Sequence, residues 1–344
     1  MRACASMQAH LKGCRREKKC RKEQTHATSG GENGETPRRV CVSGGTGFIG
    51  KEVVKELLRD GCQVCVLTRE AEKAKAALQG EEVRVAVPAQ WKEAICSCDA
   101  VINLAGEPVA SRWSEHIKAE IMQSRVNATR SIVDAINGCP DGKRPSTFVS
   151  ASAVGYYGTS DTATFDESSP PGNDYLAQVC QAWEKEAQKV NPETRLAIVR
   201  IGVTLERDGG ALGRMLPAFQ MFAGGPVGSG KQWFSWIHRE DLVRLLVEAS
   251  RNKDYEGIYN GTAPNPVRME DTCQAIARNM GRSSWLPVPS VVLQAVLGEG
   301  AATVLEGQQV LPTRTLNAGF EFKYKTIFDA MAAILRKETA ENVK

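Results

Sequence analysis

Short apolar runs alternate with stretches of helical periodicity from Arg39 to about residue 205. Short β-branched runs are typical of buried strands, whereas apolar residues three or four positions apart are typical of helices that cover a sheet. The pattern predicts strands at 40–42, 63–68, 83–87, 100–104, 147–150 and 195–200, and helices at 51–60, 114–137 and 175–189. Strands and helices in this order predict an α/β fold built on a parallel sheet.

The composition is that of an ordinary folded protein, but the charge is unevenly distributed. Hydrophobic residues make up 42% of the 344 residues and charged residues 24%, which argues against a fibrous or wholly disordered chain. The first 40 residues carry ten Lys or Arg and four Glu, and the remainder carries 34 basic and 36 acidic residues. A near-neutral folded part lacks the basic face that binds nucleic acid. No apolar run is long enough to span a bilayer.

The segment 1–37 is predicted to be a basic leader that precedes the fold. It has no sustained apolar periodicity, contains a basic run at 15–22 and ends in a glycine-rich stretch at 28–34. A start rich in Lys and Arg without a central apolar stretch is typical of an organelle transit peptide. We therefore expect a disordered leader that directs the protein to the chloroplast. A mitochondrial address and a solvated basic tail on a cytoplasmic protein stay open.

The eleven cysteines and four histidines do not form the pattern of a metal site. The cysteines are scattered along the chain without a secretion signal, so we expect most of them to be reduced. The close pairs Cys62 with Cys65 and Cys96 with Cys98 have no second ligand pair nearby, and no two histidines are four residues apart. No metal site is predicted, and the roles of the two cysteine pairs stay open.

A glycine-rich turn follows the first predicted strand and opens the first predicted helix. Gly44 lets the chain turn, Gly47 lets the backbone approach a diphosphate, and Gly50 permits close packing of helix on strand. Free N–H groups at the start of the helix attract phosphate charge. Strand, glycines and amphipathic helix in this order predict a dinucleotide-binding Rossmann fold. The predicted contacts are Gly44, Gly45, Thr46, Gly47, Phe48, Ile49 and Gly50.

The end of the second predicted strand indicates which dinucleotide binds. Proteins that bind NAD carry an acidic residue there, which accepts a hydrogen bond from the adenosine ribose. This chain has Thr68 and Arg69 instead. A carboxylate would repel a 2′-phosphate, whereas a hydroxyl and a guanidinium can both donate hydrogen bonds to one. NADP(H) is therefore the predicted cofactor.

Two further segments complete the predicted cofactor crevice. A turn of small residues follows the fourth predicted strand, at the carboxyl edge of the sheet where such a crevice lies. Arg200 ends the sixth predicted strand and is predicted to contact the cofactor or an anionic substrate; an ion-pair role for it stays open. The predicted contacts in the turn are Asn103, Leu104, Ala105 and Gly106.

With these segments in hand, the chain resembles the extended short-chain dehydrogenase/reductase superfamily. The resemblance is to an atypical branch of epimerase-family, cell-division-inhibitor-like proteins with a small C-terminal domain, and it runs from about Arg39 to Ala330. It implies an NADP-type cofactor, and plastid placement for plant-type members that carry a leader. Besides the two turns already described, it rests on the motifs at 150–158, 165–170, 199–203, 228–242 and 305–312, and on Gly319 with Phe320.

The resemblance also implies how the chain is divided. A doubly wound parallel sheet forms a Rossmann core that binds NADP at 38–205, and the remainder of the epimerase-like domain, with substrate-side segments, follows at 206–284. A small appended domain at 285–335 completes a smaller C-terminal lobe on the substrate side. A tail at 336–344 ends the chain.

The catalytic residues that the resemblance implies are incomplete in this chain. The superfamily uses a Ser and a Tyr-x-x-x-Lys pair, in which Lys lowers the pKa of the tyrosine so that its phenolate can exchange a proton. Ser152 and Tyr175 stand where the serine and the tyrosine belong, but Val179 stands where the lysine belongs. A phenol without a neighbouring cation is a poor base at neutral pH. Ser152 and Tyr175 are candidate catalytic residues on this basis.

Four other residues are candidates for a role in the pocket. Tyr156 and Tyr157 follow the fifth strand, where they either donate hydrogen bonds to a substrate or form an aromatic lining. His238 and Asp241 are three residues apart and can share a helix face, but the resemblance favours a structural role for this pair.

Two functions stay open. The first is an NADP-dependent oxidoreductase or epimerase that acts on a small carbonyl or sugar-like substrate. The second is a non-catalytic, nucleotide-sensing regulatory protein of an organelle; plastid division is suggested for it by analogy alone. The missing lysine favours the second function. A small-molecule substrate of unknown identity is expected, a protein partner or a homodimer stays open, and nucleic acid is not an expected partner.

Overall fold

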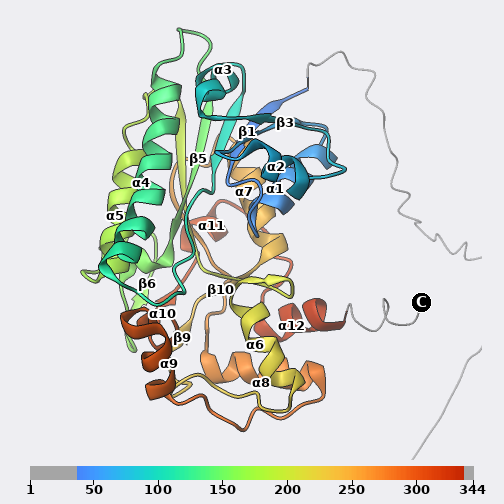
Figure 1. Ribbon diagram of the computed structural model, residues 1–344, viewed down its shortest axis with the longest axis vertical. Coiled ribbons are helices and arrows are strands. Elements are labelled where there is room, and N and C mark those ends of the chain that lie inside the picture. The colour runs from blue at the N-terminus through green and yellow to red at the C-terminus, as the bar shows by residue number, and fades with distance from the viewer. Residues whose placement is uncertain (1–36, 337–344) are drawn as a thin grey trace, which may run out of the picture. The chain divides into compact units, whose positions relative to one another are not determined.

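A seven-stranded parallel sheet forms the centre of the protein in a computed structural model that describes residues 37–336 (Figure 1). The predicted leader up to residue 36, and the tail beyond Arg336, lie outside the described residues. The strand order crosses over between β1 and β4, which confirms the predicted doubly wound Rossmann sheet. From edge to edge the strands are β11 (Gly257–Gly261), β7 (Arg195–Ile201), β5 (Thr147–Ala153), β4 (Ala100–Asn103), β1 (Arg39–Ser43), β2 (Gln63–Leu67) and β3 (Val83–Ala86).

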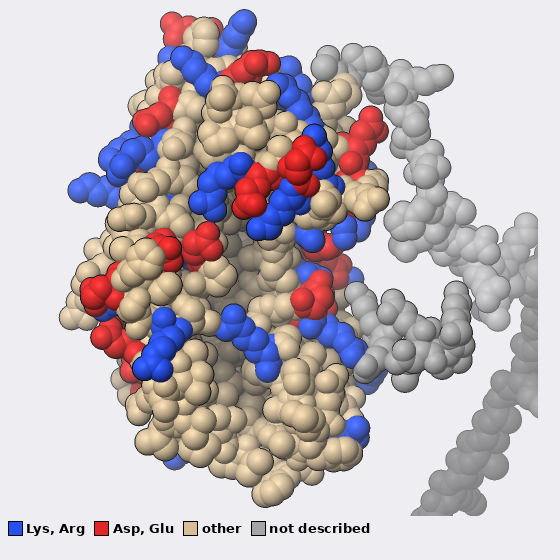
Figure 2. All heavy atoms as spheres, viewed as in Figure 1, with Lys and Arg blue, Asp and Glu red and all other residues tan. Residues whose placement is uncertain are grey.

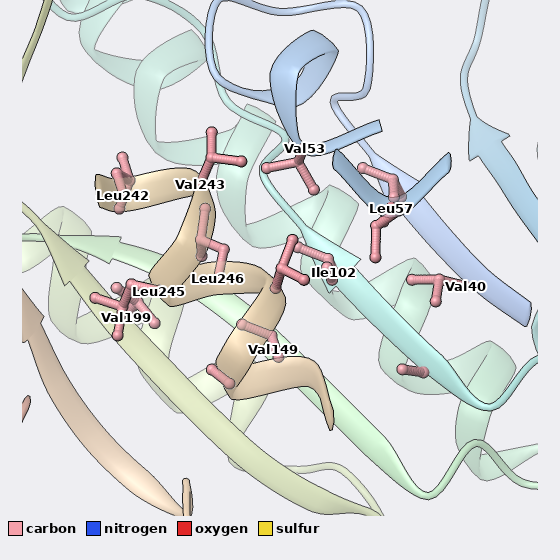
Figure 3. Packing of buried hydrophobic residues seen from close by; sticks show 14 of the residues in the cluster. Val40, Val53, Leu57, Ile102, Val149, Val199, Leu242, Val243, Leu245 and Leu246 are labelled. Atoms are coloured by element: carbon pink, nitrogen blue, oxygen red, sulfur yellow. The ribbon is translucent and has the colours of Figure 1, made fainter. Parts of the chain in front are cut away.

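Helices cover both faces of the sheet because successive strand side chains alternate between the faces. On one face, α1 (Gly50–Arg59) and α7 (Arg239–Arg251) bury their apolar sides. Figure 3 shows Val53 and Leu57 of α1 and Leu246 of α7 packed over Val40 of β1 and Ile102 of β4. On the other face lie α3 (Trp91–Cys96), α4 (Glu115–Asn137) and α5 (Tyr175–Ala187). The short helix α2 (Ala71–Ala77) precedes β3.

A helical lobe extends the molecule beyond the carboxyl edge of the sheet (Figure 1). Helices α6 (Gly210–Gln220), α8 (Met269–Met280) and α12 (Ile327–Arg336) share an apolar core around the buried Trp236. Shorter elements complete the described chain: η1 (Pro88–Gln90), η2 (Val154–Tyr157), β6 (Thr164–Phe165), β8 (Val203–Glu206), β9 (Trp233–Phe234), β10 (Trp236–His238), β12 (Val267–Arg268), α9 (Ser290–Leu297), η3 (Gly298–Ala301), α10 (Ala302–Leu305), β13 (Gln309–Val310) and α11 (Thr313–Asn317).

The C-terminal segment is tied to the rest of the fold at several points. Strand β13 pairs with β6, and Val310 packs against Val154 and Tyr157 at the carboxyl end of β5. Further on, Phe320 and Phe322 belong to the same apolar core as α1 and α7. The segment predicted as an appended domain therefore shares its core with the sheet, and the domain boundaries at 205 and 284 stay predictions.

Most cysteines of the described range are free thiols, as expected from the sequence. Cys62 and Cys65 are free, as are four further cysteines of the described range. The structure has a disulfide between Cys96 and Cys139, which the sequence analysis did not predict.

Within residues 37–336, no helix is long and apolar enough to cross a membrane, and no three His, Cys, Asp or Glu side chains are grouped as a metal site would require.

Candidate functional site

The turns that follow β1, β2 and β4 meet at the carboxyl edge of the sheet. The Leu104 N–H donates to the carbonyl of Ser43 at 3.0 Å. Gly44 has φ +73°, and a Cβ placed there would lie 2.7 Å from the Leu104 carbonyl carbon. The Arg69 guanidinium reaches Glu107 at 3.4 Å, which brings the tip of β2 to the turn after β4. The structure therefore brings together the three segments predicted to bind the cofactor.

The glycine turn packs so closely that a side chain has no room at Gly44 or Gly50. A Cβ on Gly50 would lie 2.1 Å from the Gly44 carbonyl oxygen, and the Gly47 N–H donates to that same oxygen at 3.0 Å. Helix α1 begins at Gly50, and no described side chain forms a capping hydrogen bond at Ile49. The first N–H groups of a helix lack partners within the helix. An uncapped helix start behind a bare glycine turn is suited to hold an anion.

Phe48 fixes the outer side of the glycine turn. A Cβ on Gly209 would lie 2.8 Å from the Phe48 ring, and the Arg239 guanidinium lies 4.8 Å from the centre of that ring. Arg239 is itself held by Asp208, whose carboxylate lies 2.7 Å from a guanidinium nitrogen. A cavity of about 200 Å³ lies beside the turn, and charged residues of both signs line it: Lys51, Arg239, Glu52 and Asp208. Phe48 therefore anchors the turn to the loop before α6.

Arg69 stands free enough to bind a ligand. Its side chain is 76% exposed, and its ion-pair partner Glu107 is an exposed carboxylate on the neighbouring turn. The Thr68 hydroxyl accepts a hydrogen bond from the Glu70 N–H at 3.1 Å. Thr68 is thus held as part of the turn, while its hydroxyl hydrogen is left to donate elsewhere.

Asn103 shapes the turn after β4 from inside the protein. Its amide is buried, donates to Thr129 at 2.9 Å and accepts from the Ala105 N–H at 3.3 Å. Two residues beyond Ala105, the Glu107 carbonyl accepts a hydrogen bond of 2.9 Å from Arg125 of α4. These bonds hold the small residues of the turn against the glycine turn, so the role of Asn103 at the crevice is to set backbone geometry.

Ser152 and Arg200 meet in a buried ion pair with Glu184 of α5, a residue that the sequence analysis missed. Arg200 is 1% exposed, and its guanidinium makes two hydrogen bonds of 2.8 Å to the Glu184 carboxylate. The Ser152 hydroxyl donates to the same carboxylate at 2.7 Å. Burial alone lowers the pKa of Arg200, but the paired carboxylate outweighs it and the pKa is raised. The alternative of an ion-pair arginine thus fits Arg200, and its contact with the cofactor stays a prediction.

The same network extends to the two tyrosines after β5. Arg200 donates to the Tyr157 hydroxyl at 3.0 Å, and that hydroxyl donates to Asn260 of β11 at 2.7 Å. The Tyr156 ring lies against the guanidinium at 3.3 Å. Burial raises the pKa of Tyr157 to about 12. Tyr157 is therefore a packed hydrogen-bond link rather than a proton donor poised at neutral pH.

Tyr175 begins α5, and its hydroxyl donates to the backbone carbonyl of Lys118 on α4. Its ring makes an edge contact with Trp113 at 5.1 Å. Burial raises the pKa of Tyr175, although the cations Arg125 and Lys118 oppose that shift. Val179, at the position of the absent lysine, is buried in the core. Two cations of α4 therefore lie near the phenol, but its pKa stays above the ordinary value, so the phenol is protonated at neutral pH.

His238 and Asp241 take the structural role that the resemblance favoured. The His238 ring caps α7 by accepting a hydrogen bond from the Glu240 N–H at 3.0 Å, and it stacks on Tyr324 at 3.8 Å. Asp241 accepts hydrogen bonds from the N–H groups of Lys323 and Tyr324, both at 2.9 Å. Burial raises the pKa of Asp241 despite these bonds. The pair joins α7 to the C-terminal segment.

A hollow opens in the middle of the face drawn in Figure 2, between the sheet above and the helical lobe below. Lysine and arginine side chains stand on its lower rim, and acidic side chains stand on its left rim. Clefts at the carboxyl edge of such sheets are where ligands bind. Charged side chains of both signs therefore border the hollow.

Comparison with known proteins agrees with this architecture. A model of the NAD dependent epimerase/dehydratase family matches residues 40–260, and a model described as a domain of unknown function (DUF1731) matches residues 288–334. The crystal structure of human epimerase family protein SDR39U1 (isoform2) with NADPH superposes with a TM-score of 0.80 and 36% identity. That comparison covers 87% of this chain and 99% of the human one.

Two relatives show how far the similarity extends. The chloroplastic epimerase family protein SDR39U1 homolog of Arabidopsis thaliana is 52% identical over 305 residues, which cover 88% of each chain. Epimerase family protein YfhF of Bacillus subtilis is 37% identical over 298 residues, which cover 86% of this chain and 97% of YfhF. The resemblance seen in the motifs is confirmed, and the chain belongs to the NAD dependent epimerase/dehydratase family.

Proposed function

We propose that the protein binds NADP(H) along the carboxyl edge of the sheet. The observation that carries the proposal is the uncapped start of α1 behind a glycine turn in which Gly44 and Gly50 have no room for a side chain. Backbone N–H groups at such a helix start bind the diphosphate of a dinucleotide. The human relative whose structure is described with NADPH supports the proposal by similarity.

The residues of the crevice fit the cofactor at each of its charged parts. The glycine turn would hold the diphosphate with its backbone N–H groups, and Lys51 lines the cavity beside it. The exposed Arg69 guanidinium and the Thr68 hydroxyl would hold the 2′-phosphate of the adenosine ribose. The turn from Asn103 to Gly106 would lie along the adenosine. When bound, the nicotinamide would supply hydride transfer.

Replacing Arg69 by Asp tests the choice between NADPH and NADH. The change replaces a hydrogen-bond donor to the 2′-phosphate by a group that repels it, so the affinity for NADPH is expected to fall by about 100-fold. The affinity for NADH is expected to change by no more than about 3-fold, since NADH lacks that phosphate. Calorimetric titration of both nucleotides measures the two affinities.

Arg84→Asp is the matched control for this titration. Arg84 is an exposed arginine of the neighbouring strand β3 and pairs with Glu93. Its replacement is expected to leave both affinities unchanged. Equal losses of NADPH and NADH affinity in Arg69→Asp would contradict a phosphate role for Arg69.

We infer two candidate uses of the bound nucleotide. The first is an oxidoreductase or epimerase reaction on a small carbonyl or sugar-like substrate, with Ser152 and Tyr175 near the reacting oxygen. Membership of the epimerase/dehydratase family supports it. The second is a nucleotide-sensing role without catalysis. It is favoured by the hydroxyls of Ser152 and Tyr175, which donate to Glu184 and to the Lys118 carbonyl, and by Val179 in place of lysine.

A substrate screen with two variants separates these uses. Oxidation of NADPH is followed spectroscopically with a panel of carbonyl compounds and nucleotide sugars. An enzyme is expected to turn over at least one of them, with a rate that falls about 100-fold or more in Tyr175→Phe. Equal rates in Tyr175→Phe, Ser152→Ala and the unchanged protein would count against chemistry at these hydroxyls. Tight NADPH binding without any turnover would favour the sensing role.

We propose a chloroplast location for the protein. The basic segment 1–37 and the similarity to a relative named as chloroplastic support this location. A fluorescent protein fused behind residues 1–37 is expected to be imported by isolated chloroplasts and shortened during import. Import by mitochondria instead would overturn the proposal.

A further inference from the structure

The disulfide between Cys96 and Cys139 lies at the end of the sheet opposite the nucleotide crevice. Cys96 is the last residue of α3, and Cys139 follows α4 by two positions. The two residues are 43 positions apart, and their Cα atoms are 5.4 Å apart. Cys98 leads into β4, so this group lies at the amino edge of the parallel strands, whereas the glycine turn lies at the carboxyl edge (Figure 1).

The two halves of the disulfide differ in their access to solvent. Cys139 is 3% exposed and packs in the apolar core formed by α3, α4 and the sheet. Cys96 is partly exposed and packs against the outside of that core. Two of the neighbouring residues on α3, Lys92 and Glu93, are fully on the surface. An incoming thiolate can therefore approach Cys96 and not Cys139.

Three free thiols lie on the same face of the sheet as the disulfide. Cys41 and Cys65 are opposite each other on β1 and β2, and the Cys41 thiol is within hydrogen-bonding reach of Cys65 and Cys98. Cys41 and Cys98 are buried. Hydrogen bonds from these two neighbouring thiols, together with burial, raise the pKa of Cys41, so it stays a thiol at neutral pH. A reduced dithiol exchanges with a disulfide and not with a free thiol, so within the described residues the Cys96–Cys139 bond is where it reacts.

We propose that the Cys96–Cys139 bond is a reversible redox-modification site, opened by a protein dithiol of the Cys-x-x-Cys class that attacks Cys96. The thiolate of the dithiol forms a bond to the Cys96 sulfur, and Cys139 leaves as a thiolate that takes a proton from water. The second thiol of the partner then attacks the mixed disulfide. It releases Cys96 as a thiol and leaves the partner oxidised to its own disulfide, so that two electrons and two protons pass to this protein.

The site controls the stability of the fold and leaves nucleotide binding unchanged. The bond closes a loop of 43 residues that contains β4 and α4, and opening it restores conformational freedom to the unfolded chain. The midpoint of thermal unfolding is expected to fall by about 5 °C on reduction. The affinity for NADPH is expected to stay within about 2-fold, since the crevice is at the other edge of the sheet. The site does not depend on the proposed function.

The test uses the full chain purified without reductant. Peptide mapping under non-reducing conditions is expected to find Cys96 linked to Cys139. A Cys-x-x-Ser variant of a thioredoxin-class protein, which cannot complete the second step, is expected to stay attached to Cys96. Dithiothreitol is expected to lower the thermal midpoint of the unchanged protein, while the double variant Cys96→Ser with Cys139→Ser has the lower midpoint with or without reductant. Cys98→Ser is the matched control and is expected to keep both the attachment and the shift.

Three outcomes would overturn the proposal. The first is that Cys96 and Cys139 are both free thiols in the protein purified in air. The second is that the Cys-x-x-Ser probe stays attached to Cys139 and not to Cys96. The third is that dithiothreitol leaves the thermal midpoint of the unchanged protein in place, a measurement that does not require any variant to fold.

Discussion

Replacing Glu184 by Gln is expected to lower the free energy of unfolding by about 3–5 kcal/mol. Glu184 is 4% exposed and accepts hydrogen bonds from both Arg200 and Ser152. The neutral amide leaves the Arg200 guanidinium as a charge in the interior without a counter-charge. Removing one partner of a buried ion pair is costly for this reason, even where the intact pair itself adds little stability. Urea denaturation followed by circular dichroism measures the change.

Glu193→Gln is the matched control for this prediction. Glu193 also pairs with an arginine, Arg144, at 2.6 Å, but its side chain is 69% exposed. Exposed pairs contribute about 0–1 kcal/mol, so this variant is expected to stay close to the unchanged protein. A loss below about 1 kcal/mol in Glu184→Gln would mean that water reaches Arg200, and the description of a dry ion pair would then be wrong.

The glutamate of this ion pair could not be predicted from the sequence. Ser152 and Arg200 end neighbouring strands, and the sequence correctly placed both at the carboxyl edge of the sheet. Glu184, which both residues contact, lies on α5, the helix that connects the two strands. Nothing in the neighbouring sequence distinguishes it from a glutamate on an exposed helix face. Whether a polar side chain at a strand end faces a crevice or a helix depends on the packing of α5, which periodicity does not specify.

The first half of the sheet could be predicted because each of its strands is short, apolar and followed by a helix. The predicted strand at 63–68 and the observed β2 differ by one residue, and the predicted helix at 114–137 differs from α4 by one. Beyond residue 205, the strand that completes the seven-stranded sheet, β11, was not predicted. It carries glycine at both ends and the buried Asn260, so it lacks the continuous apolar run that predicts a central strand. Helix α7 was not predicted either, although Leu242, Leu245 and Leu246 have helical spacing.

The meeting of the three segments predicted to bind the cofactor could be predicted as well as the first strands, because each segment is local in sequence. The turns after β1, β2 and β4 each follow a recognisable strand, and the carboxyl ends of parallel strands meet at one edge. The disulfide was not predictable in this way. Cys96 and Cys139 come together only through the packing of α3 on α4, and eleven cysteines without the structure allow many pairings.

Replacing Gly47 by Asp is expected to weaken NADPH binding by about 100-fold or more while leaving the fold intact. The backbone at Gly47 lies outside the left-handed region, and a Cβ there meets only the Gly44 carbonyl oxygen, at 3.2 Å. A side chain at Gly47 therefore needs a shift of the Gly44 carbonyl of only a few tenths of an ångström, in contrast to one at Gly50, where the Cβ would lie 2.1 Å from the same oxygen. A carboxylate at the start of α1 would occupy the N–H groups of the helix and repel the diphosphate, a penalty of about 3 kcal/mol or more.

Gly47→Asn separates charge from bulk in this prediction, since asparagine has the shape of aspartate without its charge. Its affinity for NADPH is expected to fall by about 10-fold, and the thermal midpoints of the two variants without nucleotide are expected to agree with that of the unchanged protein. Calorimetric titration with NADPH gives the affinities. Equal losses in both variants would mean that the side chain blocks the backbone sterically. No loss in either would show that the diphosphate does not lie on this turn, because a full negative charge within contact of a bound diphosphate cannot be without effect.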